Sequence, residues 1–234
     1  MKKWFLRNYK NYICLVVAII LLACANLFFE YSNFGSDAIF ALNQGLALTT
    51  NITIGQSSII IGVIAFIIIL IIDRKSIGVG TVLMTLTMGI FYDLIKALNI
   101  IPNIGVMEFD NIILEYGLKL LYILLAIGIG GFSVALYIYA NRGISPLEGI
   151  LIKINKVTNV PFWLLKIIND VLFFLVGFIM GATISFGSII AACLYGPVIS
   201  WFTKLFNKLN FLGDKETNEK EQNKNKPKKD SSNK

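Results

Sequence analysis

The sequence predicts an all-α membrane protein with six transmembrane helices, and three observations support this prediction. Hydrophobic residues make up 56% of the 234-residue chain and charged residues only 15%, whereas a soluble domain has about 25% charged residues. The chain also contains several apolar runs with almost no charge, and roughly 20 such residues cross the ~30 Å hydrocarbon core of a bilayer. Finally, the charges concentrate in short segments between these runs and at the two ends of the chain.

The first predicted span covers residues 12–29 and follows a basic segment at residues 1–11. A basic segment before an apolar run is also typical of a cleaved signal peptide, and Ala23-Cys24-Ala25 resembles a cleavage site. The hydrophobic region of a signal peptide has about 7–15 residues. Because the apolar run here continues to Phe29, the sequence favours an uncleaved first helix.

Five more spans and two shorter segments follow. We predict the spans at residues 56–72, 77–98, 114–139, 161–182 and 186–206. Residues 33–55 and 141–160 contain glycine or proline, which break helices, so we predict that each enters the membrane and returns as a re-entrant half-helix. We predict a loop at residues 99–113, which contains Glu108 and Asp110. Residues 207–234 form a tail that we expect to be disordered, because it has too little apolar surface to bury.

The chain repeats part of its pattern after about 108 residues. Asn33-Phe-Gly35 matches Asn141-Arg-Gly143 at an offset of 108. Gly80-Thr81 matches Gly187-Ser188 at an offset of 107. These matches involve glycine and small hydroxyl residues, which hydrophobicity alone does not require. We therefore predict two membrane repeats, residues 12–98 and 114–206. With three spans each, the second repeat is inverted relative to the first.

The basic residues predict the orientation in the membrane. In this topology 18 of the 21 lysines and arginines lie on the face that carries both termini. Cytoplasmic loops carry the excess of such residues, so we predict cytoplasmic termini and an extracytoplasmic 99–113 loop. The seven lysines of the tail would meet anionic lipid headgroups of the bilayer. The five acidic residues among them weaken that contact and argue against a nucleic-acid partner.

Composition excludes several kinds of chemistry. The chain has no histidine, which rules out histidine-ligated metal sites and Ser-His-Asp triads. Cys14, Cys24 and Cys193 lie in apolar runs, where we interpret them as small hydrophobic residues. The sequence also shows no ATP-binding loop and no nucleophile–base pair. We therefore do not expect an enzyme, a cofactor or a metal site.

Polar side chains inside apolar segments are the candidate substrate-binding residues, because such residues are costly in lipid and most often functional. They are Asp37, Asn43, Gln44, Glu148, Lys166, Asn169 and Asp170. Asp37 and Glu148 also stand at the starts of the half-helices, where a carboxylate can simply cap the helix. Asn43 and Gln44 line a cavity or bond neighbouring helices together.

Lys166 and Asp170 lie four residues apart on one predicted helix and can form an ion pair. At a rise of 1.5 Å per residue, Asp170 lies about 13 Å beyond Pro161, near the middle of the membrane. Two interpretations stay open. The pair either locks the two repeats together or takes part in a solute site or gate.

The order and spacing of several motifs resemble a known family. In the first half they are Gly35-x-Asp37, Gln44-Gly45 and Gly78-x-Gly80-Thr81. In the second half they are Asn141-x-Gly143-Ile-Ser-Pro146, Asn169-Asp170, Gly187-Ser188 and Gly196-Pro197. Together they resemble the YczE/YyaS/YitT membrane proteins of bacteria over about residues 12–206.

This resemblance implies a multi-pass protein of the bacterial cell (plasma) membrane with a transport-related role and no stated substrate. The chain departs from the family pattern at Ala38, where proline is common, at Glu148, where aspartate is usual, and at Lys166, where arginine is usual. Lysine lacks the planar guanidinium that grips a carboxylate with two hydrogen bonds, so Lys166 is a poor carboxylate clamp.

Two classes of function stay open on the sequence. The repeats and the intramembrane charges favour a small-solute transporter, or the membrane-embedded substrate-binding subunit of one, whose ligand is an unknown small solute or ion. The small size and the lack of a soluble catalytic domain permit a non-transporting membrane scaffold or regulator. Its partner would then be another protein or a second copy of the chain.

Overall fold

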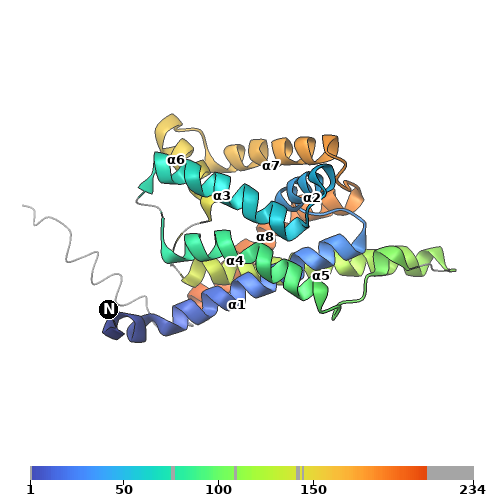
Figure 1. Cartoon of the computed structure of the whole chain (residues 1–234), viewed down its shortest axis with the longest axis horizontal. Coiled ribbons are helices and arrows are strands. Elements are labelled where there is room, and N and C mark those ends of the chain that lie inside the picture. The colour runs from blue at the N-terminus through green and yellow to red at the C-terminus, as the bar shows by residue number, and fades with distance from the viewer. Residues whose placement is uncertain (1, 75–76, 108–109, 141–142, 144, 210–234) are drawn as a thin grey trace, which may run out of the picture.

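The structure, a computed structural model, describes residues 2–74, 77–107, 110–140, 143 and 145–209, and all the regular secondary structure among them is helical (Figure 1). The long helices are α1 (Lys2–Ser32), α3 (Ile54–Ile72), α4 (Val79–Ala97), α5 (Ile112–Ala140), α7 (Phe162–Ile179) and α8 (Phe186–Leu209). Each contains a stretch long and apolar enough to cross a membrane. The prediction of a helical multi-pass membrane protein with six candidate spans is confirmed.

Two helices of 13 residues occupy the segments between the spans, α2 (Ala38–Thr50) and α6 (Pro146–Thr158). At 1.5 Å per residue each is about 20 Å long, too short to cross a bilayer. Asp37 starts α2, because its carboxylate accepts a hydrogen bond from the Phe40 backbone N–H at 2.7 Å. Both helices end at an asparagine in the left-handed conformation, Asn51 and Asn159.

The helices form two layers (Figure 1). In one layer α1 and α5 pack together, α4 lies against α1, and α8 lies against α5. In the other layer α2 packs on α7 and α6 packs on α3. The closest packing between layers is that of α3 on α4. A short 3-10 helix, η2 (Ile104–Val106), lies in the loop before α5 and contacts α1.

Two glycines with positive φ bring the short helices against the starts of long ones. Gly35 has φ +109°, and a Cβ there would lie 2.5 Å from Ser188 Oγ on α8. Gly143 has φ +139°, and a Cβ there would lie 2.6 Å from Thr81 Oγ1 on α4. Only glycine combines this backbone conformation with so close an approach. The loop before α2 therefore rests on the second half of the chain, and residue 143 rests on the first half.

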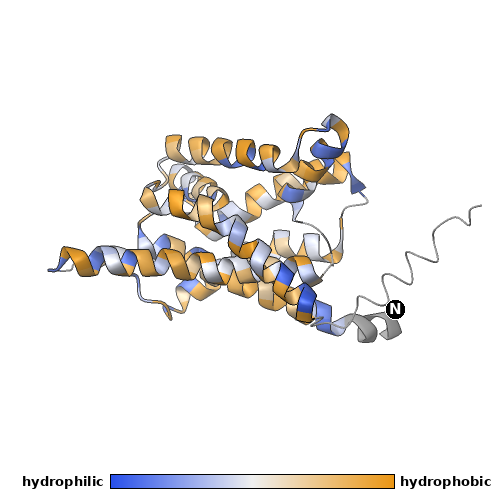
Figure 2. Cartoon of the chain, turned by 180° about the vertical axis from the view of Figure 1, so that it is seen from behind, coloured by the Kyte–Doolittle hydropathy of each residue, from blue (hydrophilic) through white to orange (hydrophobic). Residues whose placement is uncertain are grey.

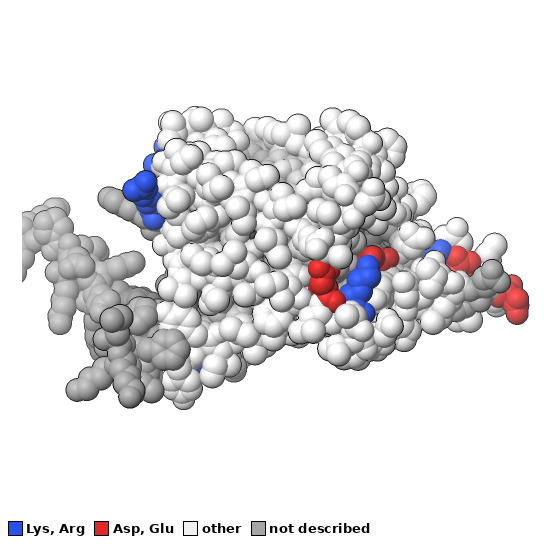
Figure 3. Space-filling view, in the orientation of Figure 1, with Lys and Arg blue, Asp and Glu red and all other residues white. Residues whose placement is uncertain are grey.

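On the face that Figure 3 shows, charged side chains lie at the left end and over the right half, and the band between them is almost free of charge. Most residues of the helices are apolar (Figure 2). Lys96 forms an ion pair with Glu30 at 2.7 Å, and Lys119 forms one with Glu115 at 2.6 Å. This uncharged band is what a protein that crosses a bilayer requires.

The ends of the predicted segments differ slightly from the helices. The predicted N-terminal segment 1–11 continues into α1 from Lys2 onward, and α8 runs to Leu209, three residues into the predicted tail. Residues 210–234, for which we predict disorder, lie outside the described residues.

Candidate functional site

A cavity of about 380 Å³ lies between the two layers and is lined by residues from all eight α-helices and from the caps of α2 and α6. Pockets that hold small molecules have volumes of about 300–1,000 Å³. Most of the lining is apolar, with a small number of polar and charged side chains among it. A molecule rather than a bare ion fits a space of this size.

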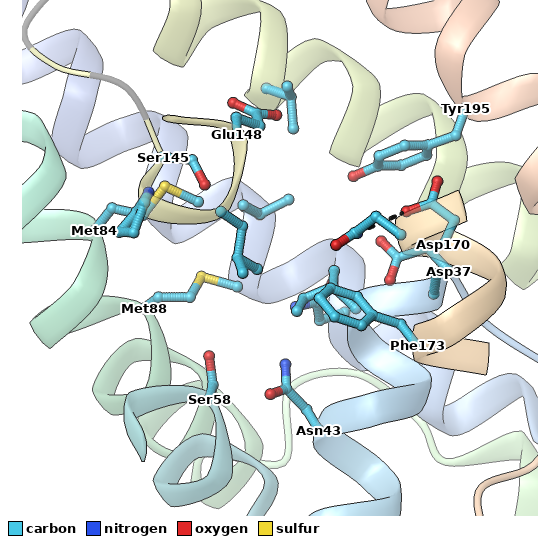
Figure 4. A pocket seen from close by; sticks show the side chains of 18 of the residues that line it. Asp37, Asn43, Ser58, Met84, Met88, Ser145, Glu148, Asp170, Phe173 and Tyr195 are labelled. Carbon is cyan, nitrogen blue, oxygen red and sulfur yellow. Dashed lines mark hydrogen bonds between the residues drawn. The ribbon is translucent and has the colours of Figure 1, made fainter. Parts of the chain in front are cut away.

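Asp37, Lys166 and Asp170 line one side of the cavity. Figure 4 shows Asp37, Asp170 and the Tyr195 ring directed toward the same space. Lys166 Nζ donates a hydrogen bond to Asp170 Oδ1 at 2.8 Å, and Asn169 Nδ2 donates to the same oxygen at 3.4 Å. The predicted ion pair on α7 therefore forms, and it lines the cavity.

Glu148 and Ser145 lie on the opposite side, near Met84 (Figure 4). In the sequence, Asp37 and Glu148 lie in the segments that connect candidate membrane spans, outside the spans themselves. Burial raises the pKa of the Asp37 carboxyl, against the Phe40 backbone N–H and the Lys166 charge, which lower it. Burial likewise raises the pKa of the Glu148 carboxyl, and Lys166 again lowers it. Three carboxylates and a single ammonium group thus line the cavity among the described residues.

Asn43 is the most deeply buried of the candidate residues. It is 4% exposed, and its Oδ1 has no hydrogen-bond partner among the described residues. The side chain is directed toward the cavity (Figure 4). The Tyr137 hydroxyl, on a side chain that is 5% exposed, is likewise unpartnered and belongs to the cavity wall. An unsatisfied buried polar group costs about 1–3 kcal/mol, so both groups are poised for a partner that enters the cavity.

Six of the seven candidate residues line this cavity, and Gln44 does not. Its Oε1 accepts a hydrogen bond from the Thr183 backbone N–H at 2.9 Å. Gln44 also borders a second hollow, together with Glu30, Asp93 and Lys96. Successive helical residues point about 100° apart, so Asn43 and Gln44 face different parts of the molecule.

The sequence did not point to Tyr195, Tyr137, Met84 and Met88, which also line the cavity. A signal was available for Tyr195. Tyrosines of membrane helices concentrate at the two interfaces, whereas Tyr195 lies near the middle of α8. The methionines carried no such signal, because an apolar residue in a span is expected everywhere.

The described residues contain no group of three or more Asp, Glu, Cys or His side chains that could hold a metal ion. Cys14, Cys24 and Cys193 are free thiols. The carboxylates of the cavity therefore do not converge on a single point.

Comparison with known proteins gives a family and no function. The profile of DUF6198, a family of unknown function, matches residues 9–204. An uncharacterized protein of Haemophilus influenzae is 23% identical over 202 residues, which cover 86% of this chain and 87% of that protein. No solved structure matches the chain.

Proposed function

The chain belongs to the DUF6198 family of unknown function, and we propose that it is a small-solute transporter or the membrane-embedded substrate-binding subunit of one. The observation that carries this proposal is the central cavity. Asp37, Glu148 and the Lys166–Asp170 ion pair all line it, between apolar helices. Ionisable residues are costly at membrane depth and mark solute or ion pathways.

We further propose that the membrane part consists of two inverted repeats, as the sequence predicts. The cavity supports this, because its lining positions recur at the offsets of the sequence repeat. From α2 and its cap come Asp37, Ala38, Ile39 and Asn43; from α6 and its cap, 108 residues later, come Ser145, Pro146, Leu147 and Leu151. The α3 positions Ser58, Ile61, Gly62 and Ala65 correspond to Lys166, Asn169, Asp170 and Phe173 on α7. Met84, Thr85 and Met88 correspond, 107 residues later, to Ala191, Ala192 and Tyr195.

The direction of the helices supports the same proposal. Figure 1 shows α1 and α5 running in opposite directions, and α3 and α7 also running in opposite directions. The glycine contacts are also reciprocal. Gly35 of the first half approaches Ser188 of the second half, and Gly143 of the second half approaches Thr81 of the first half. In this proposal α2 and α6 are the re-entrant half-helices, which enter from opposite sides of the membrane. The repeated lining positions are consistent with the proposed relation to the YczE/YyaS/YitT proteins, whose motifs occur in both halves of the chain.

We place both termini in the cytoplasm of a bacterial cell, as the basic residues predict. Single cysteines in a chain without its three native ones test this orientation. The positions are the exposed Arg74 and Lys156, predicted cytoplasmic, and Val106, predicted extracytoplasmic and 77% exposed. A membrane-impermeant maleimide should label Val106→Cys in intact cells, and Arg74→Cys and Lys156→Cys only after the membrane is opened. Labelling of all three from one side would rule out the inverted arrangement.

Transport itself is tested by ligand binding and uptake. A solute that binds the folded state stabilises it by about 2.7 kcal/mol at a hundredfold excess over its Kd. We expect one class of metabolite to raise the unfolding temperature of the purified protein and to enter proteoliposomes that contain it. A folded protein that neither binds nor transports any solute of a broad panel, but copurifies with a partner, would favour the alternative, a membrane scaffold or regulator.

A further inference from the structure

The charges of the cavity do not balance. Asp37, Glu148 and Asp170 carry three negative charges when ionised, and Lys166 carries the one positive charge among the described lining residues. Lys166 is already engaged by Asp170 at 2.8 Å. Asp37 and Glu148 have no ion-pair partner within 4.0 Å among the described residues. A ligand with positive charge would compensate this excess.

The unpartnered acceptor on Asn43 adds a second requirement, independent of the carboxylates: the ligand must carry hydrogen-bond donors. Its Oδ1 is a carbonyl oxygen, which can only accept a hydrogen bond. Asn43 is only 4% exposed, and its side chain is directed into the cavity. A ligand that donates N–H or O–H bonds satisfies this atom, whereas an anionic oxygen would be repelled by it.

The other lining residues of the cavity favour an organic cation over a metal ion as the ligand. The side chains of Met84, Met88 and Phe173 give the cavity an apolar surface, and the Tyr195 ring offers a π face to a nearby cation. The volume of about 380 Å³ exceeds what a bare ion fills, and the acidic groups do not converge as metal ligands do.

We propose that the ligand of this cavity is a small organic cation, whose ammonium or guanidinium groups are bound by Asp37 on one side of the cavity and by Glu148 on the other, with an apolar body against Met84, Met88 and Phe173. This proposal names the substrate class and rests on the proposed solute-binding function of the same cavity. Asn43 Oδ1 and the Tyr137 hydroxyl accept further hydrogen bonds from the donors of the ligand. Tyr195 closes the side of the cavity next to Asp37.

A series of ligands that share a five-carbon chain and differ in charge tests the proposal. The probes are pentylamine, 1,5-diaminopentane, 1,5-pentanediol and glutarate, added to the purified full-length protein in detergent. We expect the two amines to raise the unfolding temperature and to bind in calorimetry, and we expect the diol and the diacid to have no effect.

Two isosteric variants in the cavity and one outside it link the binding to the carboxylates. Asp37→Asn keeps a residue that caps α2, and Glu148→Gln keeps the size of the side chain. Each should raise the Kd of the amine that binds best by about tenfold or more, which is ~1.4 kcal/mol. Glu115→Gln removes the same charge near the start of α5, outside the cavity lining, and should leave the Kd unchanged.

Selective stabilisation by the diol or by glutarate would overturn the cation proposal and leave transport intact. Amine binding that responds to Glu115→Gln as strongly as to Asp37→Asn would also overturn it, because the cavity would then not be the site. A failure of all four probes, with Asp37→Asn and Glu148→Gln more stable than the parent, would show that the two carboxylates hold no amine. Amine binding without uptake would support the ligand class and count against transport.

Discussion

The third and fourth helices of the first half meet differently from those of the second half. In the first half α3 packs closely on α4, and Gly89 lies directly against the carbonyl oxygen of Gly55. In the second half α7 and α8 have no comparable interface and instead form two walls of the cavity. Gly196, the counterpart of Gly89, would have no atom within 4 Å of an added Cβ.

Side-chain size accounts for this difference. Gly55, Ser58 and Gly62 on α3 are small, and small residues allow two membrane helices to approach closely. Their counterparts 108 residues later on α7 are Trp163, Lys166 and Asp170, which are too large for such a contact. Larger residues in place of small ones along one helix face therefore turn a packed interface into the charged wall of a cavity.

The largest difference in stability should be that between the Gly89→Ala and Gly196→Ala variants. An alanine Cβ at position 89 collides with the backbone of Gly55, which cannot move without shifting α3. We expect a loss of about 3 kcal/mol, at the upper end of overpacking costs. Gly196→Ala should change stability by less than about 0.5 kcal/mol apart from helix propensity. Thermal unfolding of both variants in detergent measures this, and equal losses would contradict the comparison.

The contacts of the two short helices give a second matched pair. An alanine at Gly177 on α7 would place its Cβ 2.7 Å from the Ala41 carbonyl oxygen on α2. An alanine at Gly149 on α6 would meet only side-chain atoms of Ile69 on α3, the nearest at 3.3 Å. We expect Gly177→Ala to cost about 2 kcal/mol. Gly149→Ala should cost much less in the same unfolding measurement, because the Ile69 side chain has to yield by only a few tenths of an ångström. A larger loss for Gly149→Ala would mean that α6 is held more rigidly than α2.

The Lys166–Asp170 ion pair has no counterpart at the equivalent positions of the first half, which are Ser58 and Gly62. Its removal tests whether the pair serves the site or the fold. Asp170→Ala leaves Lys166 without its partner, and a fully buried pair loses about 3–5 kcal/mol in this way. Because the Lys166 side chain is 49% exposed, we expect a smaller loss of about 1–2 kcal/mol. The double variant Lys166→Met with Asp170→Leu should regain the stability of the parent protein, as judged by thermal unfolding.

The same double variant separates the two roles. If the pair serves the site, the folded double variant loses solute binding and uptake. A double variant that is both stable and fully active would show that the pair is structural. The site would then depend on Asp37 and Glu148, from the segments that begin the two short helices.

Neighbouring residues on α2 should give the smallest effects, of opposite kinds. Gln44→Ala removes the acceptor of the Thr183 N–H and should cost about 1 kcal/mol without changing ligand affinity. Asn43→Ala removes an unpartnered oxygen, so it should not lower stability but should weaken binding. Unfolding and calorimetry of both variants measure these effects. A loss of affinity in Gln44→Ala alone would place the ligand in the second hollow instead.

The number and position of the spans followed from the sequence alone. The predicted span at 186–206 agrees with α8 at Phe186–Leu209, and the predicted span at 56–72 agrees with α3 at Ile54–Ile72. The cap at Asp37 was also predictable, because an aspartate before an apolar helix has a local partner three residues later. These features are local: they depend on about 20 consecutive residues and on the fixed thickness of a bilayer.

The composition of the site was decided by the tertiary structure. Polarity in an apolar run identified Asn43 and Gln44 equally, yet one faces the cavity and the other holds the loop before α8. Tyr195 and Met88 joined the cavity wall without a polar pattern that marks them. Which side of each helix meets the cavity depends on contacts between residues more than 100 positions apart, such as Gly35 with Ser188. Hydrophobicity sets the length of a span, but only this long-range packing sets its rotation, and the rotation decides which side chains share a space.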